Sequence, residues 1–129
     1  MKLKLKIINL DGIYFDGEVD LLNITVASGN ITVLAGHIPL ISSIKISIMY
    51  TSNDHEKKYY AIAGGTLFVD ENGAKIITNA IEREDEIDFE RAELSRKRAQ
   101  ERLSLEKDDI DIQRAQVSLQ RALNRLRLK

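Results

Sequence analysis

The pattern of apolar and polar positions changes near residues 80–87. Before that point it often alternates with a period of two, as in residues 2–7 (KLKLKI), which predicts strands with one buried face. Turn signals such as Asp11-Gly12, Asp16-Gly17 and a polar turn over 51–56 separate these segments. We expect strands at residues 2–7, 13–15, 19–27, 31–34, 44–50, 58–63, 66–69 and 75–78. Many short strands with close turns predict an antiparallel sandwich or barrel.

From Ile87 onward the sequence has no glycine or proline, and apolar residues recur at helical spacing. Residues 87–103 and 110–126 repeat each other without a gap, with nine of seventeen positions identical. Asp85 and Asp88 are both candidate caps for the first helix. The predicted class is α+β, with an N-terminal antiparallel β-sandwich over 1–84 and a C-terminal two-helix antiparallel hairpin over 85–129.

The repeat conserves a face of small side chains between its two copies. Small residues let two helix backbones approach closely but bury little apolar area each. We therefore expect a marginally stable hairpin that can close or open, although an ordinary helical hairpin explains the same face. The expected face consists of Ala92, Ser95, Ala99 and Leu103, repeated as Ala115, Ser118, Ala122 and Leu126.

The repeat also conserves arginines: Arg91, Arg98 and Arg102 recur as Arg114, Arg121 and Arg125. Guanidinium groups match phosphate or carboxylate oxygens in bidentate geometry. The alternative is a solvated face with short-range pairs, Asp88 with Arg91 and Asp111 with Arg114. For an ordinary helix the solvated face is the preferred explanation, and the repetition of arginine at three positions lowers that preference.

The charges are unevenly distributed: residues 87–129, the tail, are basic, and residues 1–86, the body, are acidic. The net charge is −1, yet residues 87–129 carry 11 Lys and Arg against 8 Asp and Glu. This balance indicates an acidic contact for the tail, such as a nucleotide or an acidic protein surface, but is too small to favour non-specific nucleic-acid binding.

The sequence offers little for catalysis or metal binding. The absence of cysteine excludes a disulfide framework and a thiolate metal site. His37 and His55, the only histidines, lie in different turns without metal-ligand spacing. No nucleophile–base arrangement or phosphate-binding glycine loop stands out, and Gly64-Gly65 is better explained as a bulge or tight strand connection. We predict that the chain alone is not an enzyme.

Residues 21–44 contain no formal charge and are long enough to cross a bilayer. Asparagines, serines, glycines, His37 and Pro39 interrupt this stretch. We therefore expect a soluble protein rather than a membrane-spanning one.

The chain as a whole resembles the epsilon subunit of bacterial F-type ATP synthase, of the ATP-binding type. In the predicted sandwich the resemblance rests on Asp16-Gly17, Ser28-Gly29, the segment 36–40 (GHIPL) and the segment 63–65 (AGG). In the hairpin, residues 87–92 (IDFERA) fit the family's I/L-D-x-x-R-A motif. Residues 110–115 fit it too, but we interpret that copy as a packing repeat rather than a second nucleotide site.

The resemblance implies that ATP is a regulatory ligand and that no metal is needed. Asp88 would accept from the adenine amino group, and the arginines would hold phosphates. Arginines from both helices would let one nucleotide hold the hairpin closed. By position, the implied site residues are Glu82, Asp88, Arg91, Arg98, Arg121 and Arg125.

The resemblance also implies a non-catalytic role in the central stalk, coupling proton transport to rotary ATP synthesis and inhibiting ATP hydrolysis. The implied partners are the gamma subunit, the c-ring and the alpha/beta catalytic head, at the cytoplasmic face of the cell membrane. The main alternative is a β-sandwich adaptor whose hairpin binds a partner protein without nucleotide. A small β-barrel enzyme with a helical tail is less consistent with the missing catalytic residues.

Overall fold

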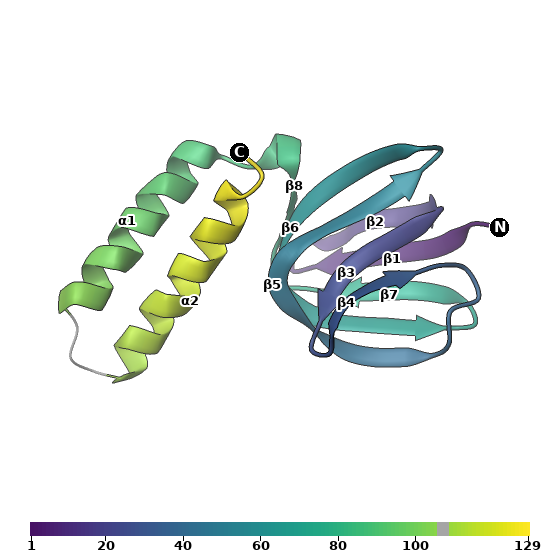
Figure 1. Ribbon diagram of the computed structural model, residues 1–129, viewed down its shortest axis with the longest axis horizontal. Coiled ribbons are helices and arrows are strands. Elements are labelled where there is room, and N and C mark those ends of the chain that lie inside the picture. The colour runs from purple at the N-terminus through teal and green to yellow at the C-terminus, as the bar shows by residue number, and fades with distance from the viewer. Residues whose placement is uncertain (106–108) are drawn as a thin grey trace. The chain divides into compact units, whose positions relative to one another are not determined.

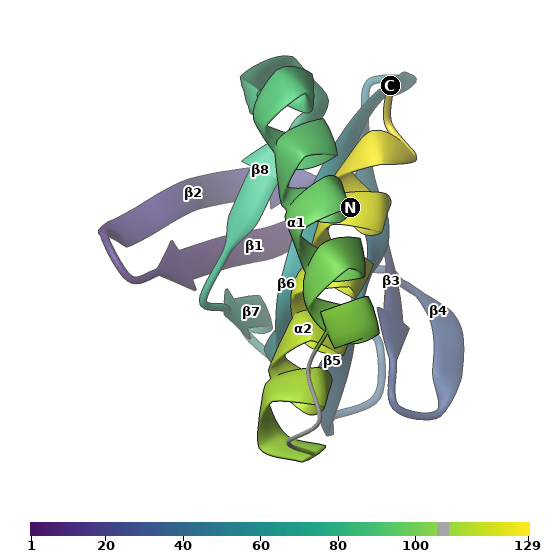
Figure 2. The ribbon, with the colours of Figure 1, turned by 90° about the vertical axis from the view of Figure 1, so that its left-hand side faces the viewer.

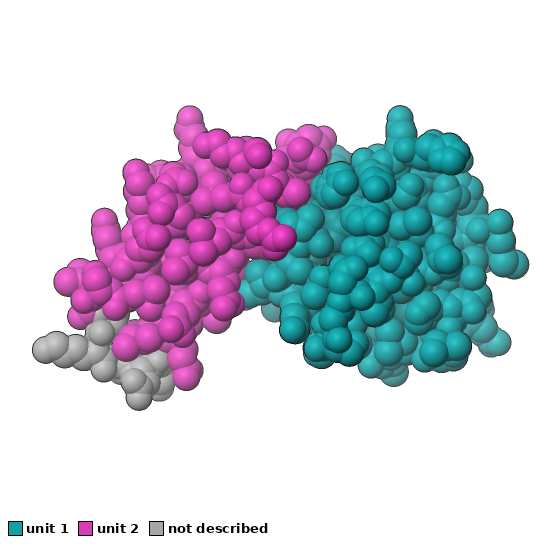
Figure 3. All heavy atoms as spheres, viewed as in Figure 1, with its two compact units in different colours: residues 1–83 teal, residues 84–129 magenta. Residues whose placement is uncertain are grey.

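The computed structural model describes the backbone of residues 1–105 and 109–129, and the side chains of residues 1–105 and 111–129. The chain divides into two compact units, residues 1–83 and 84–129 (Figure 3). The first unit is built of strands and the second of helices, which confirms the predicted α+β class. The elements are β1 (Leu3–Asn9), β2 (Gly12–Val19), β3 (Leu21–Val26), β4 (Gly29–Val33), β5 (Leu40–Asn53), β6 (Glu56–Asp70), β7 (Gly73–Ile77), β8 (Ile81–Arg83), a 3-10 turn (Glu84–Glu86), α1 (Phe89–Leu105) and α2 (Asp109–Leu126).

The strands of the first unit form one continuous sheet in the order β2-β1-β7-β6-β5-β3-β4, with β8 paired to β6. The long strands β5 and β6 pair from Leu40↔Val69 to Asn53↔Glu56 and form the middle of the sheet. Figure 2 shows β1 and β2 on one side of this pair and β3 and β4 on the other. The sheet curls over on itself into two layers (Figure 1). Neighbouring strands are antiparallel except β1 and β7, which run parallel.

The core lies between the two layers and consists of alternate residues from the strands. Leu5 and Ile7 of β1, Ile24 of β3, Ile62 of β6 and Ile76 of β7 are at most 1% exposed. Side chains of a strand alternate between its faces, so the period-two pattern of the sequence places these residues on the inner face. Burying each such side chain contributes about 1.5–3 kcal/mol.

Strand β2 is longer than the sequence predicts. The turn expected at Asp16-Gly17 is wrong, because both residues lie inside β2, where Asp16 pairs with Lys6 and Gly17 with Leu5. Pairing with β1 supplies backbone partners along the whole strand and outweighs the local turn preference of an Asp-Gly pair.

The polar turn expected over 51–56 is reduced to two residues. Asp54 and His55 have φ values of 52° and 68° and connect β5 to β6, an arrangement that matches the twist of a hairpin. Lys2 ties this turn to the start of the chain, because its ammonium donates to Asn53 Oδ1 at 2.5 Å and to Asp54 Oδ1 at 3.0 Å. Asp20 accepts from the Asp54 backbone N–H at 2.8 Å.

Strand β6 runs without interruption through Gly64-Gly65, where the sequence predicts two strands. Its register with β5 is the same on either side, with Ile46 opposite Ala63 and Ile44 opposite Gly65. The glycines therefore form no bulge against β5. Next to them β7 ends, and β8, a strand that the pattern does not predict, begins at Ile81.

The uncharged stretch 21–44 forms β3, β4 and the start of β5, rather than a helix. In the described residues no helix combines the length and apolar character that crossing a membrane would require.

Candidate nucleotide site on the helical hairpin

Asp88 caps the first helix. Its Oδ1 accepts the backbone N–H of Arg91 at 3.0 Å, and its carbonyl accepts the N–H of Ala92 at 3.0 Å. Such a cap satisfies one of the donors that a helix start leaves open. Of the two candidate caps, Asp88 is therefore the one used, and Asp85 lies in the preceding 3-10 turn.

The helices α1 and α2 lie side by side and contact each other (Figure 1). Ala92, Ala99, Ala115 and Ala122 are each at most 2% exposed, so the predicted alanine seam is confirmed. The prediction is wrong for Ser118, which is exposed. At about 100° per residue, position 118 lies roughly 40–60° from the line through Ala115 and Ala122, and a seam of methyl groups is too narrow to reach it.

The repeated arginines form a second line beside the alanines. Arg91, Arg98 and Arg102 are seven and four residues apart, which places them within about 40° of one another and about 100° from Ala92. The same spacing holds for Arg114, Arg121 and Arg125 relative to Ala115. In an antiparallel pair built from two copies of one sequence, equivalent positions lie on the same broad face. We call this line of six repeated arginines the arginine stripe.

Most of the predicted phosphate-binding groups are unengaged. Arg91, Arg98 and Arg121 are exposed, and within the described residues their guanidinium groups form no hydrogen bond or ion pair. The short pairing of Asp88 with Arg91 takes a different form, because the carboxylate accepts from the backbone of Arg91 and not from its side chain. Exposed guanidinium groups without a partner among the described residues can donate to phosphate oxygens in bidentate geometry.

Arg96 provides the contrast within the same helix. It donates to Glu93 Oε1 and to Gln100 Oε1, the latter at 3.1 Å. The hydrogen bond from Arg96 holds the pKa of Glu93 below its ordinary value. Arg96 lies five residues from Arg91 and therefore outside the stripe. On α1, the arginine outside the stripe is paired, whereas Arg91 and Arg98 within the stripe have no partner among the described residues.

The hairpin gathers five of the six predicted residues. Because the helices run antiparallel, Asp88 and Arg91 at the start of α1 lie at the same end as Arg121 and Arg125 at the end of α2 (Figure 1). Arg98 follows two turns along α1, about 10 Å from Arg91 along the axis. Arg125 is half-buried and already interacts with other groups.

Glu82, the sixth predicted residue, belongs to the first unit. It lies in β8, is half-buried, pairs with Ala61 of β6 through the backbone and takes part in further interactions. The second I-D-x-x-R-A copy begins at Ile110, whose side chain lies outside the described residues. No set of three or more His, Asp or Glu side chains within the described ranges is grouped so that it could hold a metal ion.

Comparison with known proteins covers both units. Residues 2–84 match the family model described as ATP synthase, delta/epsilon chain, beta-sandwich domain, and residues 85–129 match that of the long alpha-helix domain. The chain is 42% identical to the ATP synthase epsilon chain of Mycoplasmopsis pulmonis over 94 residues, 71% of this chain and 67% of the relative. It is 40% identical to the ATP synthase epsilon chain of Bacillus subtilis over 102 residues, 79% of this chain and 77% of the relative.

Two solved structures have a similar fold. A chain in the Euglena gracilis mitochondrial ATP synthase structure, which contains OSCP, F1 and the c-ring, superimposes with a TM-score of 0.80 at 23% identity, covering 92% of this chain and 76% of that chain. A chain in the central stalk and c-ring structure of the Tetrahymena thermophila mitochondrial ATP synthase gives a TM-score of 0.66 at 12% identity, covering 98% and 96%.

Proposed function

This chain belongs to the delta/epsilon chain family of ATP synthase, and from this premise we propose that it is the epsilon subunit of the central stalk and that its hairpin is an ATP-sensitive regulator. The subunit is not catalytic. Its role is to couple proton transport to rotary ATP synthesis and to limit ATP hydrolysis. The family match supports the first part of this proposal, and the arginine stripe supports the second.

The nucleotide binds on the stripe, across both helices. Arg91 and Arg98 of α1, with Arg121 and Arg125 of α2, hold the triphosphate oxygens. The second oxygen of the Asp88 carboxylate accepts from the adenine amino group while Oδ1 keeps the helix cap. Because both helices contribute, only the closed hairpin binds ATP.

When ATP binds only the closed hairpin, it stabilises the closed state relative to the open state by RT ln(1 + [ATP]/Kd). This amounts to about 2.7 kcal/mol when ATP is a hundred-fold above Kd. The methyl groups of the alanine seam bury little area, so a shift of this size is large compared with what holds the helices together. When ATP is scarce, the hairpin opens and its basic face engages an acidic surface of the alpha/beta head, which blocks hydrolysis.

In this proposal the sandwich binds the gamma subunit and the c-ring. The protein is therefore peripheral, held at the cytoplasmic face of the cell membrane through the complex. Co-purification of tagged chain with gamma tests this assignment separately from nucleotide binding. A chain that never retains gamma contradicts the subunit assignment whatever its affinity for ATP.

Calorimetric titration of the full chain with ATP tests the nucleotide site. We expect one ATP per chain, and Arg91→Ala or Arg98→Ala to raise Kd by about 10- to 100-fold, the loss of a charged hydrogen bond worth roughly 1.5–3 kcal/mol.

Arg114→Ala is the matched control, because Arg114 is the counterpart of Arg91 in the second copy of the repeat. Arg96→Ala controls for loss of charge on α1. Both should change Kd less than threefold. An Arg114→Ala effect as large as that of Arg91→Ala would contradict a single site that uses the two copies unequally, and no ATP binding at millimolar concentration would leave an epsilon subunit without a nucleotide sensor.

A further inference from the structure

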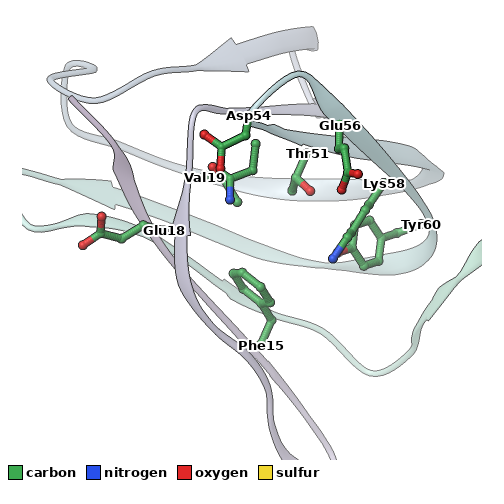
Figure 4. A pocket seen from close by; sticks show the side chains of 9 residues that line it. Phe15, Glu18, Val19, Thr51, Asp54, Glu56, Lys58 and Tyr60 are labelled. Atoms are coloured by element: carbon green, nitrogen blue, oxygen red, sulfur yellow. The ribbon is translucent and has the colours of Figure 1, made fainter.

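The first unit contains a pocket between β2 and the β5–β6 hairpin, with a cavity volume of ≈ 350 Å³. Figure 4 shows Thr51, Glu56, Lys58 and Tyr60 projecting from the hairpin toward the space that Phe15 and Val19 of β2 border. The volume falls near the lower end of the range for small-molecule sites, roughly 300–1,000 Å³. None of the nucleotide-site residues lines it.

The base of the pocket is apolar and fixed. Val19 and Tyr60 are each 3% exposed, and Phe15 packs against the core. The ring of Tyr60 is held edge-on by Tyr14, with the ring centroids 6.4 Å apart. An apolar or aromatic group of a ligand can lie against these side chains.

One hydroxyl, that of Thr51, lies among these apolar groups. Thr51 is 4% exposed, and its hydroxyl makes no hydrogen bond to any other group of the described chain. No buried side-chain nitrogen or oxygen of the described residues lacks a hydrogen-bond partner, so this hydroxyl is accessible to solvent. Thr51 lines the pocket, so its hydroxyl favours a ligand that has a polar atom next to its apolar group (Figure 4).

The mouth of the pocket presents two opposite charges. Glu56 and Lys58 are two residues apart on β6 and therefore share one face of the strand. Both are exposed, and neither forms an ion pair or hydrogen bond with another described residue. A ligand that carries both charges can pair with both groups, whereas a simple anion meets Glu56 and Asp54 and a simple cation meets Lys58.

The rim beside these charges is held in place before any ligand arrives. The Lys2 ammonium lies 2.7 Å from Asp20 Oδ1 and 3.0 Å from Asp54 Oδ1, and it also donates to Asn53, a further residue of the lining. Anchoring the β5–β6 turn reduces the entropy that a ligand would otherwise lose in ordering it.

From these observations we propose that the pocket binds a free α-amino acid with an apolar or aromatic side chain. Its carboxylate pairs with Lys58 and accepts from the Thr51 hydroxyl, and its ammonium donates to Glu56. Its side chain packs against Phe15, Val19 and Tyr60. This site lies wholly within residues 1–83 and is independent of the nucleotide proposal.

Titration of the full ¹⁵N-labelled chain with L-phenylalanine, followed by amide chemical shifts, tests the proposal. We expect saturable one-to-one shifts confined to residues near 15–19 and 51–60. N-acetyl-L-phenylalanine lacks the ammonium, and L-phenylalaninamide lacks the carboxylate. Each should bind at least about tenfold more weakly, because one charged contact is lost. A blocked analogue that binds as tightly as the free amino acid overturns the proposal, as does the absence of saturable shifts in these segments.

Variants identify the groups that recognise the ligand. Glu56→Gln and Lys58→Met remove one charge each from exposed positions and should weaken binding about tenfold, and Thr51→Val should weaken it by a smaller factor. Glu18→Gln is the matched control, because Glu18 borders the same pocket while its carboxylate points away from Thr51 and Tyr60 (Figure 4). Equal losses in Glu18→Gln and Glu56→Gln would show a general charge effect and overturn the site.

Discussion

In the middle of β6, the backbones of Gly65 and Ile77 approach so closely that a Cβ at Gly65 would overlap the Ile77 carbonyl oxygen and lie 2.9 Å from Thr78 Cα. Gly64 and Gly65 have φ values of 86° and 123°, where residues with a side chain rarely occur. The Thr78 hydroxyl donates to the Gly64 carbonyl at 2.6 Å and fixes this crossing. The sequence predicted a bulge or a tight strand connection here, whereas β6 continues through both glycines, and the Thr78 contact joins residues 14 positions apart.

Gly65→Ala should therefore destabilise the sandwich strongly. The methyl group would add a clash with backbone to the conformational cost, so we expect a loss of more than about 2 kcal/mol in the free energy of unfolding, measured with urea. Gly29→Ala is the control, because Gly29 also has a positive φ (131°) but nothing lies within 4 Å of its Cβ position. Equal losses in the two variants would mean that the close approach contributes nothing.

A second residue-scale feature is the acid sensitivity of the Lys2 anchor. The hydrogen bond from Lys2, aided by the Asp54 backbone N–H, holds the pKa of Asp20 below its ordinary value of 3.8. A carboxyl whose pKa is lower in the folded state stabilises the fold above the unfolded pKa, and this contribution is lost as pH falls through the folded pKa.

We expect wild type to lose more stability than Asp20→Asn between about pH 5 and pH 2, with the two curves converging at the acid end. Urea midpoints measured across this range check the prediction. Asp16→Asn, at an exposed position of β2, should instead follow the wild-type curve. A wild-type slope no steeper than that of Asp20→Asn would contradict the anchoring role.

At the scale of elements, periodicity predicted most of the strands and both helices. It failed for segments that are strands only because a neighbouring strand supplies their backbone hydrogen bonds. The Asp16-Gly17 segment is extended because β1 lies beside it, and the three-residue β8 exists because β6 offers partners to Ile81. The arginine stripe was readable from the repeat, since spacing alone fixes a helix face. The sandwich pocket was not, because Phe15, Thr51 and Tyr60 meet only through the strand order.

The alanine seam gives a prediction for the hairpin as an element. Ala115→Leu should force α1 and α2 apart, because Ala115 is 1% exposed, and overpacking of this kind typically costs about 1–3 kcal/mol. Hydrogen exchange of amides in α1 and α2 should accelerate, while sandwich amides stay unchanged.

Ser118→Leu is the control, since Ser118 is exposed on the same helix. It should leave exchange in the hairpin within about threefold of wild type. Faster exchange in Ser118→Leu than in Ala115→Leu would mean that the seam runs through the serines after all.

For the whole molecule, the two units differ in how they are held together. The hydrophobic core cluster is confined to residues between Leu3 and Ile81, and all of it lies in the first unit. The second unit buries chiefly methyl groups along its seam. The sandwich therefore has a complete core of its own, whereas the hairpin depends on small contacts.

A chain shortened to residues 1–84 should retain the folded sandwich. Its amide spectrum should overlay that of the full chain for strands β1 to β7, and its shifts with L-phenylalanine should persist, while binding of ATP is lost. Collapse of the dispersed spectrum would show that the helices contribute to the sandwich core. Retained ATP binding would contradict the hairpin site.

The parallel pairing of β1 with β7 constrains the order in which the chain can acquire its structure. Leu5 lies beside Ala74, so forming this contact brings together residues almost seventy positions apart. The chain loses the entropy of closing that loop before the strand pairing contributes favourable free energy. On the ribosome, β1 has only β2 as a partner until residues 73–77 emerge. The helices α1 and α2 follow the strands in the chain, so they leave the ribosome after the segments that form the sandwich.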